Sequence, residues 1–378
     1  MAAMPVLLAL AFLADTPRVE PIEPPPAEAV DSAIARGVDF LVEDQNPDGS
    51  WGGFVNTAGP VMYDPLPGSH HAFRSATTAL CVLALIELDG DRPLDAKAAD
   101  ALDKAGAWLV DDLPGVRRTT PDVLYNVWSH AYAVQAMAAM LPRAETDARR
   151  AEIRAAMEGQ LAQLDRFESV DGGWGYYDFR VQAARPSAES TSFCNAAVLV
   201  AMKAADDAGV EVNKRTLERA LLATRLQRKP DFSYLYAIGH RTRPMGGINR
   251  PGGSLGRSQA CNIALRLWGD EAVTDEVLAT WLHRLFARGG WLDIGRKRPI
   301  PHESWMGVAG YFYYFGHYYA ALCIDQLPAE DRPLFQHHMA ATMLDRQEAD
   351  GSWWDYPMYD FHQPYGTAFA LLTLRRCR

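Results

Sequence analysis

The stretches QNPDGSWGGF (residues 45–54) and RQEADGSWWDYP (residues 346–357) decide the fold, because each carries the same turn behind a helix-like run. In both, a glutamine precedes Asp-Gly and then Ser-Trp. Glycine accepts a positive φ at little cost, so Asp-Gly favours a tight turn. The glutamine can satisfy backbone groups left free at a helix end. We predict that Trp51 and Trp353 lie across these turns and pack against the next pair of helices.

Weaker copies of this turn occur elsewhere in the chain. DRFESVDGGWGYYDF, from Asp165, keeps Asp-Gly and Trp174 but has no glutamine at the same spacing. LQRKPDFSY, from Leu226, keeps only part of the pattern. Copies at long and variable spacing indicate a repeat architecture with loops of different lengths. We expect Trp174 to hold neighbouring repeats together and to take no part in chemistry.

Two kinds of predicted helix alternate six times along the chain. The first kind is amphipathic and charged on one face. These helices are expected at residues 28–44, 96–111, 147–166, 212–227, 274–288 and 333–348. The second kind is nearly uncharged and opens with a small or hydroxyl residue suited to an N-cap. The second kind is expected to start near Thr77, Ser129, Thr191, Ser258, Gly316 and Gly366.

A closed ring of hairpins satisfies this alternation. The nearly apolar helices need burial on most sides, so we place them in an inner ring, with the amphipathic helices around them. Closing the ring also covers the ends that an open array of repeats would expose. The sequence therefore predicts an all-α fold, a single (α/α)6 toroid of about six helical hairpins over residues 28–378.

The turn motif resembles the Q-x-x-D-G-x-W repeat of the terpenoid-cyclase and protein-prenyltransferase family, which includes squalene-hopene cyclase-like toroids. Arg36-Gly37, Phe40-Leu41 and the segment from Gln45 to Trp51 fit the family's full pattern, and the segment from Gln347 to Trp353 fits its core. The resemblance covers nearly all of the chain after residue 27. It implies a central cavity lined by the N-terminal ends of the inner helices.

The catalytic motifs of that family are missing from this sequence. The Asp-x-Asp-Asp motif, with which class II cyclases protonate an alkene, does not occur, and neither does Asp-Asp-x-x-Asp. The Asp-x-Cys that binds zinc in protein prenyltransferases is also missing, since Gln259 stands two residues before Cys261. Fold alone does not fix function. We predict no cofactor and no metal.

Composition narrows the partners. The net charge of the 378-residue chain is −10, so we predict no nucleic-acid partner. Its five cysteines show no paired spacing, which argues against a disulfide framework. Residues 1–27 hold an apolar, signal-like run, Met4–Ala14, and a Pro-rich linker. That run is too short to span a bilayer, and no later segment is predicted to do so. Export and a cytoplasmic location both stay open.

Polar residues gather in the loops before the predicted inner helices, where the mouth of the cavity is expected. These loops also carry His240 and His302. Histidine is the common general acid or base near neutral pH, and an arginine at a helix N-terminus suits an anion. The catalytic candidates are His130, Glu189, Arg257 and His317. The substrate-binding candidates are His71, Arg74, Trp128, Asp178, Gln259, Tyr318 and Tyr365. For His130 and His317, a satisfied core histidine is the plainer alternative.

Three functions remain open on the sequence. The first is a divergent toroid of the terpenoid-cyclase type that binds or isomerises an isoprenoid, with a small or lipid-like ligand in the central cavity. The second is a polysaccharide lyase or related sugar enzyme. For it, Asn126, His130, Arg257 and Tyr318 supply the residue types that neutralise a uronate and remove its proton. The third is a toroid that binds a partner without catalysis.

Overall fold

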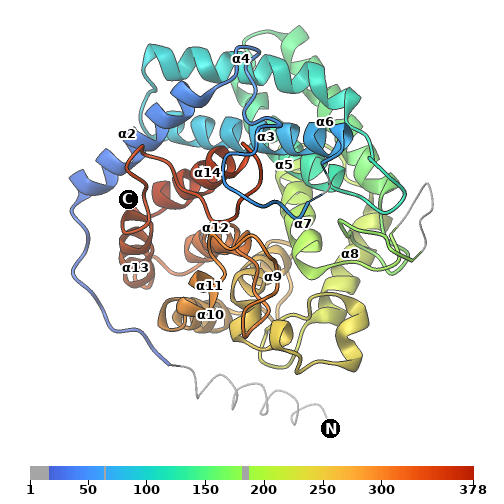
Figure 1. The fold of residues 1–378 in the computed structure, drawn as a ribbon, viewed down its shortest axis with the longest axis vertical. Helices are drawn as coiled ribbons and strands as arrows, with labels where there is room; N and C mark the ends of the chain where they lie inside the picture. The colour runs from blue at the N-terminus through green and yellow to red at the C-terminus, as the bar shows by residue number, and fades with distance from the viewer. Residues whose placement is uncertain (1–16, 64, 181–186) are drawn as a thin grey trace.

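The helices form a closed toroid in the computed structural model, which describes residues 17–63, 65–180 and 187–378 (Figure 1). The signal-like run Met4–Ala14 lies outside the described residues. The inner ring consists of α3 (Pro67–Asp91), α5 (Asn126–Met140), α7 (Ser192–Asp207), α9 (Leu255–Leu267), α12 (Phe312–Asp325) and α14 (His362–Arg375). The outer ring consists of α2 (Ala27–Asp44), α4 (Ala96–Asp112), α6 (Asp147–Arg166), α8 (Lys214–Gln227), α10 (Asp275–Ala287) and α13 (Arg332–Leu344).

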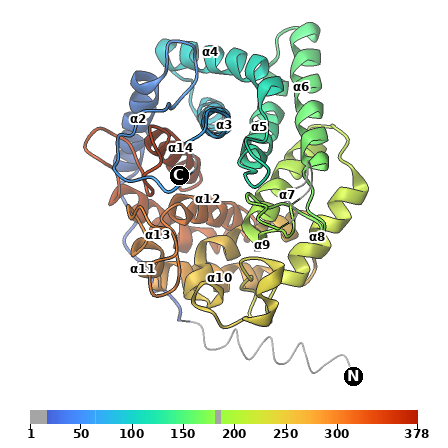
Figure 2. The same cartoon turned by 45° about the vertical axis from the view of Figure 1, so that its right-hand side comes forward.

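Contacts between consecutive inner helices run around the whole toroid. Helix α3 packs against both α5 and α14, so the last repeat meets the first. The turned view shows the inner helices surrounded by the outer ones (Figure 2). Short helical segments lie in the connections, namely α11 (Gly290–Asp293) and the 3-10 turns η1 (Leu113–Gly115), η2 (Leu141–Arg143), η3 (Ile238–Thr242), η4 (Gly247–Asn249) and η5 (Gly252–Ser254). The predicted all-α (α/α)6 toroid is confirmed.

Most inner helices begin earlier than the sequence predicted. Helix α3 starts at Pro67 rather than near Thr77, and α14 at His362 rather than near Gly366. The hydroxyl residues at these starts are not N-caps. They lie inside the helices, where Thr78 Oγ1 accepts the backbone N–H of Trp51 at 3.0 Å and Thr367 Oγ1 accepts that of Trp353 at 3.0 Å. Their hydroxyls serve the preceding turn, which explains why they recur.

The turn tryptophans join the repeats as predicted from their spacing. Trp51, Trp174 and Trp353 are fully buried. Each donates its indole N–H to a carbonyl in the last turns of the preceding outer helix, at Leu41, Leu164 and Met343. A buried indole needs such an acceptor. In these three repeats the tryptophan therefore joins the end of the outer helix to the inner helix that follows, through its indole and its backbone N–H.

The glutamines of the motif bridge neighbouring outer helices. Gln45 Nε2 donates to the carbonyl of Gly49 in its own turn and to that of Ala101 on α4, at 3.0 and 2.8 Å. Gln347 Nε2 does the same for Gly351 and for Ala33 on α2, both at 2.9 Å. The second contact joins the sixth repeat to the first. The motif therefore closes the toroid as well as spacing its repeats.

The weak copy at Leu226 keeps the turn with different residues. Phe232 takes the glycine place at a φ of 59°, and Tyr234 takes the tryptophan place. The Tyr234 hydroxyl donates to Asn262 Oδ1 on α9 at 2.9 Å. A positive φ is unusual for an aromatic residue. This repeat therefore keeps the geometry of the turn after losing its sequence.

Of the described helices, α3 alone has the length and hydropathy that a membrane crossing requires, and most of that stretch is buried inside the toroid. A buried core helix can be as long and as apolar as a membrane span. Helix α3 is such a core helix, because it packs against α5, α14 and α4. All five cysteines are free thiols, and four of them are buried in inner helices.

Candidate active site

A polar-rimmed chamber opens at the N-terminal ends of the inner helices. Its volume is about 740 Å³. The loops that precede α3, α7, α9 and α12 build it, and they contribute Tyr63, Tyr176, Glu189, Tyr236, His240, His302, Trp305 and Tyr311 among others. Pockets of several hundred Å³ suit small ligands. We call this space the outer chamber.

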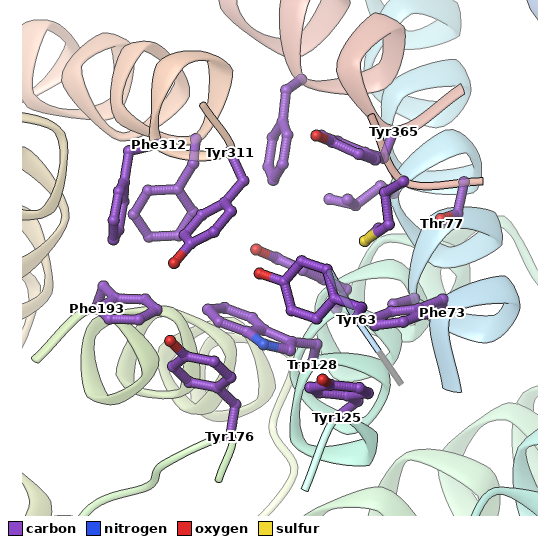
Figure 3. Close-up of a pocket in the computed structure, with 16 residues that line it drawn as sticks. Tyr63, Phe73, Thr77, Tyr125, Trp128, Tyr176, Phe193, Tyr311, Phe312 and Tyr365 are labelled. Atoms are coloured by element: carbon purple, nitrogen blue, oxygen red, sulfur yellow. The ribbon is translucent and has the colours of Figure 1, made fainter. Parts of the chain in front are cut away.

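A smaller chamber lies deeper between the inner helices, with a volume of about 110 Å³ (Figure 3). Its wall comes from α3, α5, α7, α12 and α14 and is mostly aromatic. Tyr63, Tyr176 and Tyr311 line both chambers, so these three tyrosines form the boundary between them. We call this space the inner chamber.

His302 is held in one tautomer at the rim of the outer chamber. Its Nδ1 lies 2.6 Å from the carbonyl oxygen of Gly307. A carbonyl only accepts hydrogen bonds, so Nδ1 carries the proton and Nε2 is left as a base. The Tyr311 hydroxyl lies 3.4 Å from that Nε2. His302 also has a φ of 63°, a strained conformation that is more common at functional sites.

His240 is held in the opposite tautomer. Its Nδ1 lies 3.1 Å from the side-chain amide nitrogen of Asn249, which donates. The orientation of the Asn249 amide is fixed, because its oxygen accepts from the backbone N–H of Tyr236 and its nitrogen donates to the carbonyl of Arg243. His240 Nδ1 therefore accepts, and Nε2 carries the proton. One chamber thus holds one imidazole that can accept a proton and one that can donate a hydrogen bond.

Tyr236 packs against both histidines, and the charge of Arg257 affects both of them. The Tyr236 ring contacts His240 at 5.6 Å and His302 at 5.4 Å between ring centroids. Desolvation lowers the pKa of both histidines, and the Arg257 charge lowers both further. Both imidazoles are therefore neutral near pH 7, as the two tautomers require.

Three of the residues predicted from the sequence line these chambers. Glu189 lines the outer chamber, and its Oε2 accepts the backbone N–H of Gly239 at 3.1 Å. Trp128 and Tyr365 line the inner chamber. The Tyr365 hydroxyl donates to Asp355, a fully buried carboxyl whose pKa burial raises to about 7.

His130 and His317 lie in the core between helices. His130 Nδ1 donates to Gln160 Oε1 at 2.7 Å, and its Nε2 lies 3.2 Å from the Asn126 amide. His317 Nδ1 donates to the carbonyl of Tyr313 at 2.7 Å. Burial lowers the pKa of each to about 4. Both are satisfied core histidines, the plainer alternative that the sequence left open, and neither is among the residues lining the two chambers.

Arg257 lies fully buried below the outer chamber. Its guanidinium donates to the carbonyls of Tyr234, Gly253 and Ile248, so it holds the loop that carries His240. Desolvation lowers its pKa to about 10. In this place it supports the chamber from behind and does not face a ligand in it.

The remaining predicted residues lie elsewhere on the toroid. Gln259 Nε2 donates to the carbonyl of Trp281 on α10. Tyr318 donates to Gln135 at 3.4 Å inside the core. His71 is hydrogen-bonded to Asp112, and the other two residues make ion pairs, Arg74 with Asp48 and Asp178 with Arg118. These five residues do not line either chamber.

The sequence named His240 and His302 among the loop residues but did not select them, and it missed the boundary tyrosines. The boundary tyrosines Tyr63, Tyr176 and Tyr311 lie in connections that lead to inner helices, as do Tyr125, Tyr236 and Tyr359. A tyrosine in each of the six connections was the available signal.

Comparison with known proteins adds the fold's relatives. No family model matches the chain, and no curated protein matches it in sequence. Among matching solved structures is cellobiose 2-epimerase from Spirochaeta thermophila, 16% identical, with a TM-score of 0.59 over 93% of this chain and 96% of that one. A D-mannose isomerase is 14% identical, with a TM-score of 0.56 over 93% of this chain and 98% of that one.

A sugar complex is also among the matches. It is an inactive variant of the α-1,6-mannanase GH76A of Salegentibacter sp. HEL1_6 with α-1,6-mannotetrose. It is 10% identical, with a TM-score of 0.56 over 92% of this chain and 98% of that one. At sequence identities this low, the structural similarity shows a shared fold and nothing about function.

The predicted membership of the terpenoid-cyclase and protein-prenyltransferase family is wrong. The structural relatives are sugar epimerases, isomerases and hydrolases, not terpenoid cyclases or prenyltransferases. The lipid-like ligand implied by that family is corrected with it. The motif misled because Gln45 and Trp51 solve a general problem, the satisfaction of helix ends in a ring of hairpins. Such a turn therefore indicates the architecture of the protein and not its family.

Proposed function

We propose that this protein is a sugar-isomerising or sugar-epimerising enzyme whose reaction takes place in the outer chamber. The observation that carries the proposal is the pair His302 and His240, which face one chamber in opposite tautomers. The relatives named as an epimerase and an isomerase support the sugar class.

The reaction is a proton transfer at the carbon next to a sugar carbonyl. In an open-chain aldose, His302 Nε2 accepts the proton from C2, and the electron pair of that C–H bond forms an enediolate. The Tyr311 hydroxyl, beside His302 Nε2, lies where it can donate to the sugar oxygen. The imidazolium formed on His302 then returns this proton to C1 or C2, while His240 Nε2–H donates a hydrogen bond that stabilises the negative charge on the enediolate oxygens. General acid–base catalysis of this kind contributes roughly 10² to 10⁴ in rate.

Glycoside hydrolysis fits the chamber less well. Both common hydrolytic mechanisms use a pair of carboxyl groups on either side of the scissile bond. Among the described residues lining the outer chamber, Glu189 is the one carboxylate. Glu189 is better placed to bind sugar hydroxyls beside the exposed Trp305 at the rim, on whose ring a sugar can stack.

Deuterium exchange tests the proposal directly. The protein is incubated with D-mannose, D-glucose or cellobiose in D₂O, and NMR follows the label at C1 and C2 together with the formation of new sugars. We expect enzyme-dependent deuterium at these carbons. His302→Gln and His240→Gln are each expected to lower the exchange rate at least a hundredfold.

A control substitution of the same type distinguishes a loss of catalysis from a general effect of replacing a histidine. His337→Gln changes a half-buried histidine on the outer helix α13, away from both chambers, and is expected to leave exchange unchanged. The proposal fails if none of the sugars exchanges, or if both chamber variants exchange like the unmodified protein while remaining folded by circular dichroism.

A further inference from the structure

The inner chamber is an aromatic enclosure for which the proton-transfer chemistry of the outer chamber has no use. Of the sixteen described residues that line it, twelve are aromatic and none carries a charge. Figure 3 shows Tyr63, Trp128, Phe193 and Phe312 arranged around a common space. The same inner helices carry many aliphatic side chains, but the residues that line this cavity are mostly aromatic.

The rings are packed so that they offer their faces in several directions. Phe193 meets Phe312 nearly edge-on, with centroids 5.0 Å apart and planes at 83°. Tyr63 meets Tyr125 in the same way, at 5.4 Å and 73°. The face of an aromatic ring is electronegative and attracts a cation that lies above it, with tryptophan the strongest. An enclosure of this kind suits a positive charge better than a neutral group of the same shape.

The hydrogen-bonding state of the tyrosines selects the kind of cation. The hydroxyl of Tyr176 is paired with that of Tyr236, and the hydroxyl of Tyr365 is donated to Asp355. A primary ammonium entering the chamber would lose its hydration and meet only hydroxyl oxygens, since no carboxylate is among the described lining residues, which is costly. A quaternary ammonium has no N–H to satisfy, so the same wall imposes no such cost on it.

Size and charge agree with this choice. At about 110 Å³ the chamber admits a compact head group and has no room for a sugar ring. The boundary tyrosines connect it with the outer chamber, where the rest of a ligand can lie. The net charge of −10 favours the approach of a cation.

We propose that the inner chamber binds a quaternary ammonium group, the trimethylammonium head of a choline-like molecule whose tail extends into the outer chamber. This site takes a ligand of a different class from the sugar, and it stands whether or not the sugar reaction occurs.

A pair of isosteric ligands tests the site by calorimetry on the full-length protein. The probes are choline, its neutral carbon isostere in which carbon replaces the ammonium nitrogen, and ethanolamine as the primary ammonium. Choline is expected to bind at least ten times more tightly than either comparison ligand. Equal or tighter binding of the neutral isostere overturns the proposal, and so does the absence of saturable choline binding.

Substitutions in the wall locate the binding. Trp128→Leu is expected to weaken choline at least tenfold while changing the affinity of the neutral isostere much less. Tyr63→Leu, in a connection outside the helices, makes the same test if the first variant does not fold. Trp268→Leu is the control, because this tryptophan lies at the end of α9 and donates to Leu199 away from the chamber. Choline affinity that is unchanged in a folded wall variant also overturns the proposal.

Discussion

The role of a residue in this toroid depends more on its burial than on its residue type. His130 and His302 carry the same side chain, but His130 is enclosed between Gln160 and Asn126, while His302 lines the outer chamber. Both are held neutral, His130 because protonation would place a second N–H against the donating amide of Asn126. One neutral imidazole stabilises the core, and the other is available for chemistry.

Core histidines make the protein acid-sensitive. Burial lowers the pKa values of His130 and His317 from 6.5 to about 4. The unfolded chain therefore binds more protons than the folded one below pH 6.5, so the free energy of unfolding falls as pH falls toward 4. The loss approaches about 3 kcal/mol for each histidine.

Urea unfolding between pH 7 and 4 measures this loss. His130→Gln removes one titrating group, so its free energy of unfolding is expected to depend less on pH than that of the unmodified protein. His337→Gln, on the outer surface of α13, is expected to retain the full dependence. Parallel pH profiles for all three proteins would refute the assignment.

At the scale of elements, the first and sixth repeats are each held by a turn that bonds to more than one helix. Trp353 ties α13 to α14, and Gln347 ties the same turn to α2. Gln45 makes the equivalent bridge from the first turn to α4. The bridging bonds are equivalent, although one joins neighbours in sequence and the other joins opposite ends of the chain.

Removing either glutamine is expected to cost a similar amount. Gln347→Ala and Gln45→Ala each leave the turn carbonyl, of Gly351 or Gly49, without its side-chain donor and remove the bond to the neighbouring helix, which costs about 1–3 kcal/mol in the free energy of unfolding. Gln326→Ala, an exposed glutamine at the end of α12, is the control and should change stability by less than about 0.5 kcal/mol. Chemical denaturation measures all three, and a Gln347 variant as stable as the control would contradict the bridging role.

At the scale of the whole molecule, ion pairs at the end of α14 help to close the ring. Arg376, at the end of α14, pairs with Glu87 on α3 at 2.7 Å and with Asp325 on α12 at 2.9 Å. Its side chain is 9% exposed, so this three-membered cluster joins the last helix to both of its inner neighbours in a protected place. Arg378 makes a more exposed pair with Asp31 on α2.

These two arginines offer a comparison of buried and exposed closure. Arg376→Gln removes the ion pair of Asp325 and leaves Glu87 with Arg375 alone, and is expected to lower the free energy of unfolding by about 2–3 kcal/mol. Arg378→Gln breaks an exposed pair and should cost at most about 1 kcal/mol. Thermal and urea unfolding of the two variants decide the order, and equal losses would argue against the cluster as the closing contact.

The sequence predicted the architecture better than the site, for physical reasons. Helical periodicity and the turns at Trp51 and Trp353 are local signals, so hairpins and their order followed from short stretches. The chambers depend on residues from connections far apart in the chain, such as Tyr63, His240 and His302, which only the closed ring brings together. Inner-helix starts were placed too late because hydroxyls such as Thr78 and Thr367 bond to the preceding turn instead of capping a helix.

Tyr311 belongs to the wall of both chambers and stands 3.4 Å from the basic nitrogen of His302. A ligand that moves this ring from the inner side changes the environment of a sugar on the outer side. Thermodynamic reciprocity then requires that the sugar alter the affinity for the inner ligand by the same factor. One shared side chain would thus make the two compartments communicate without any rearrangement of the helices around them.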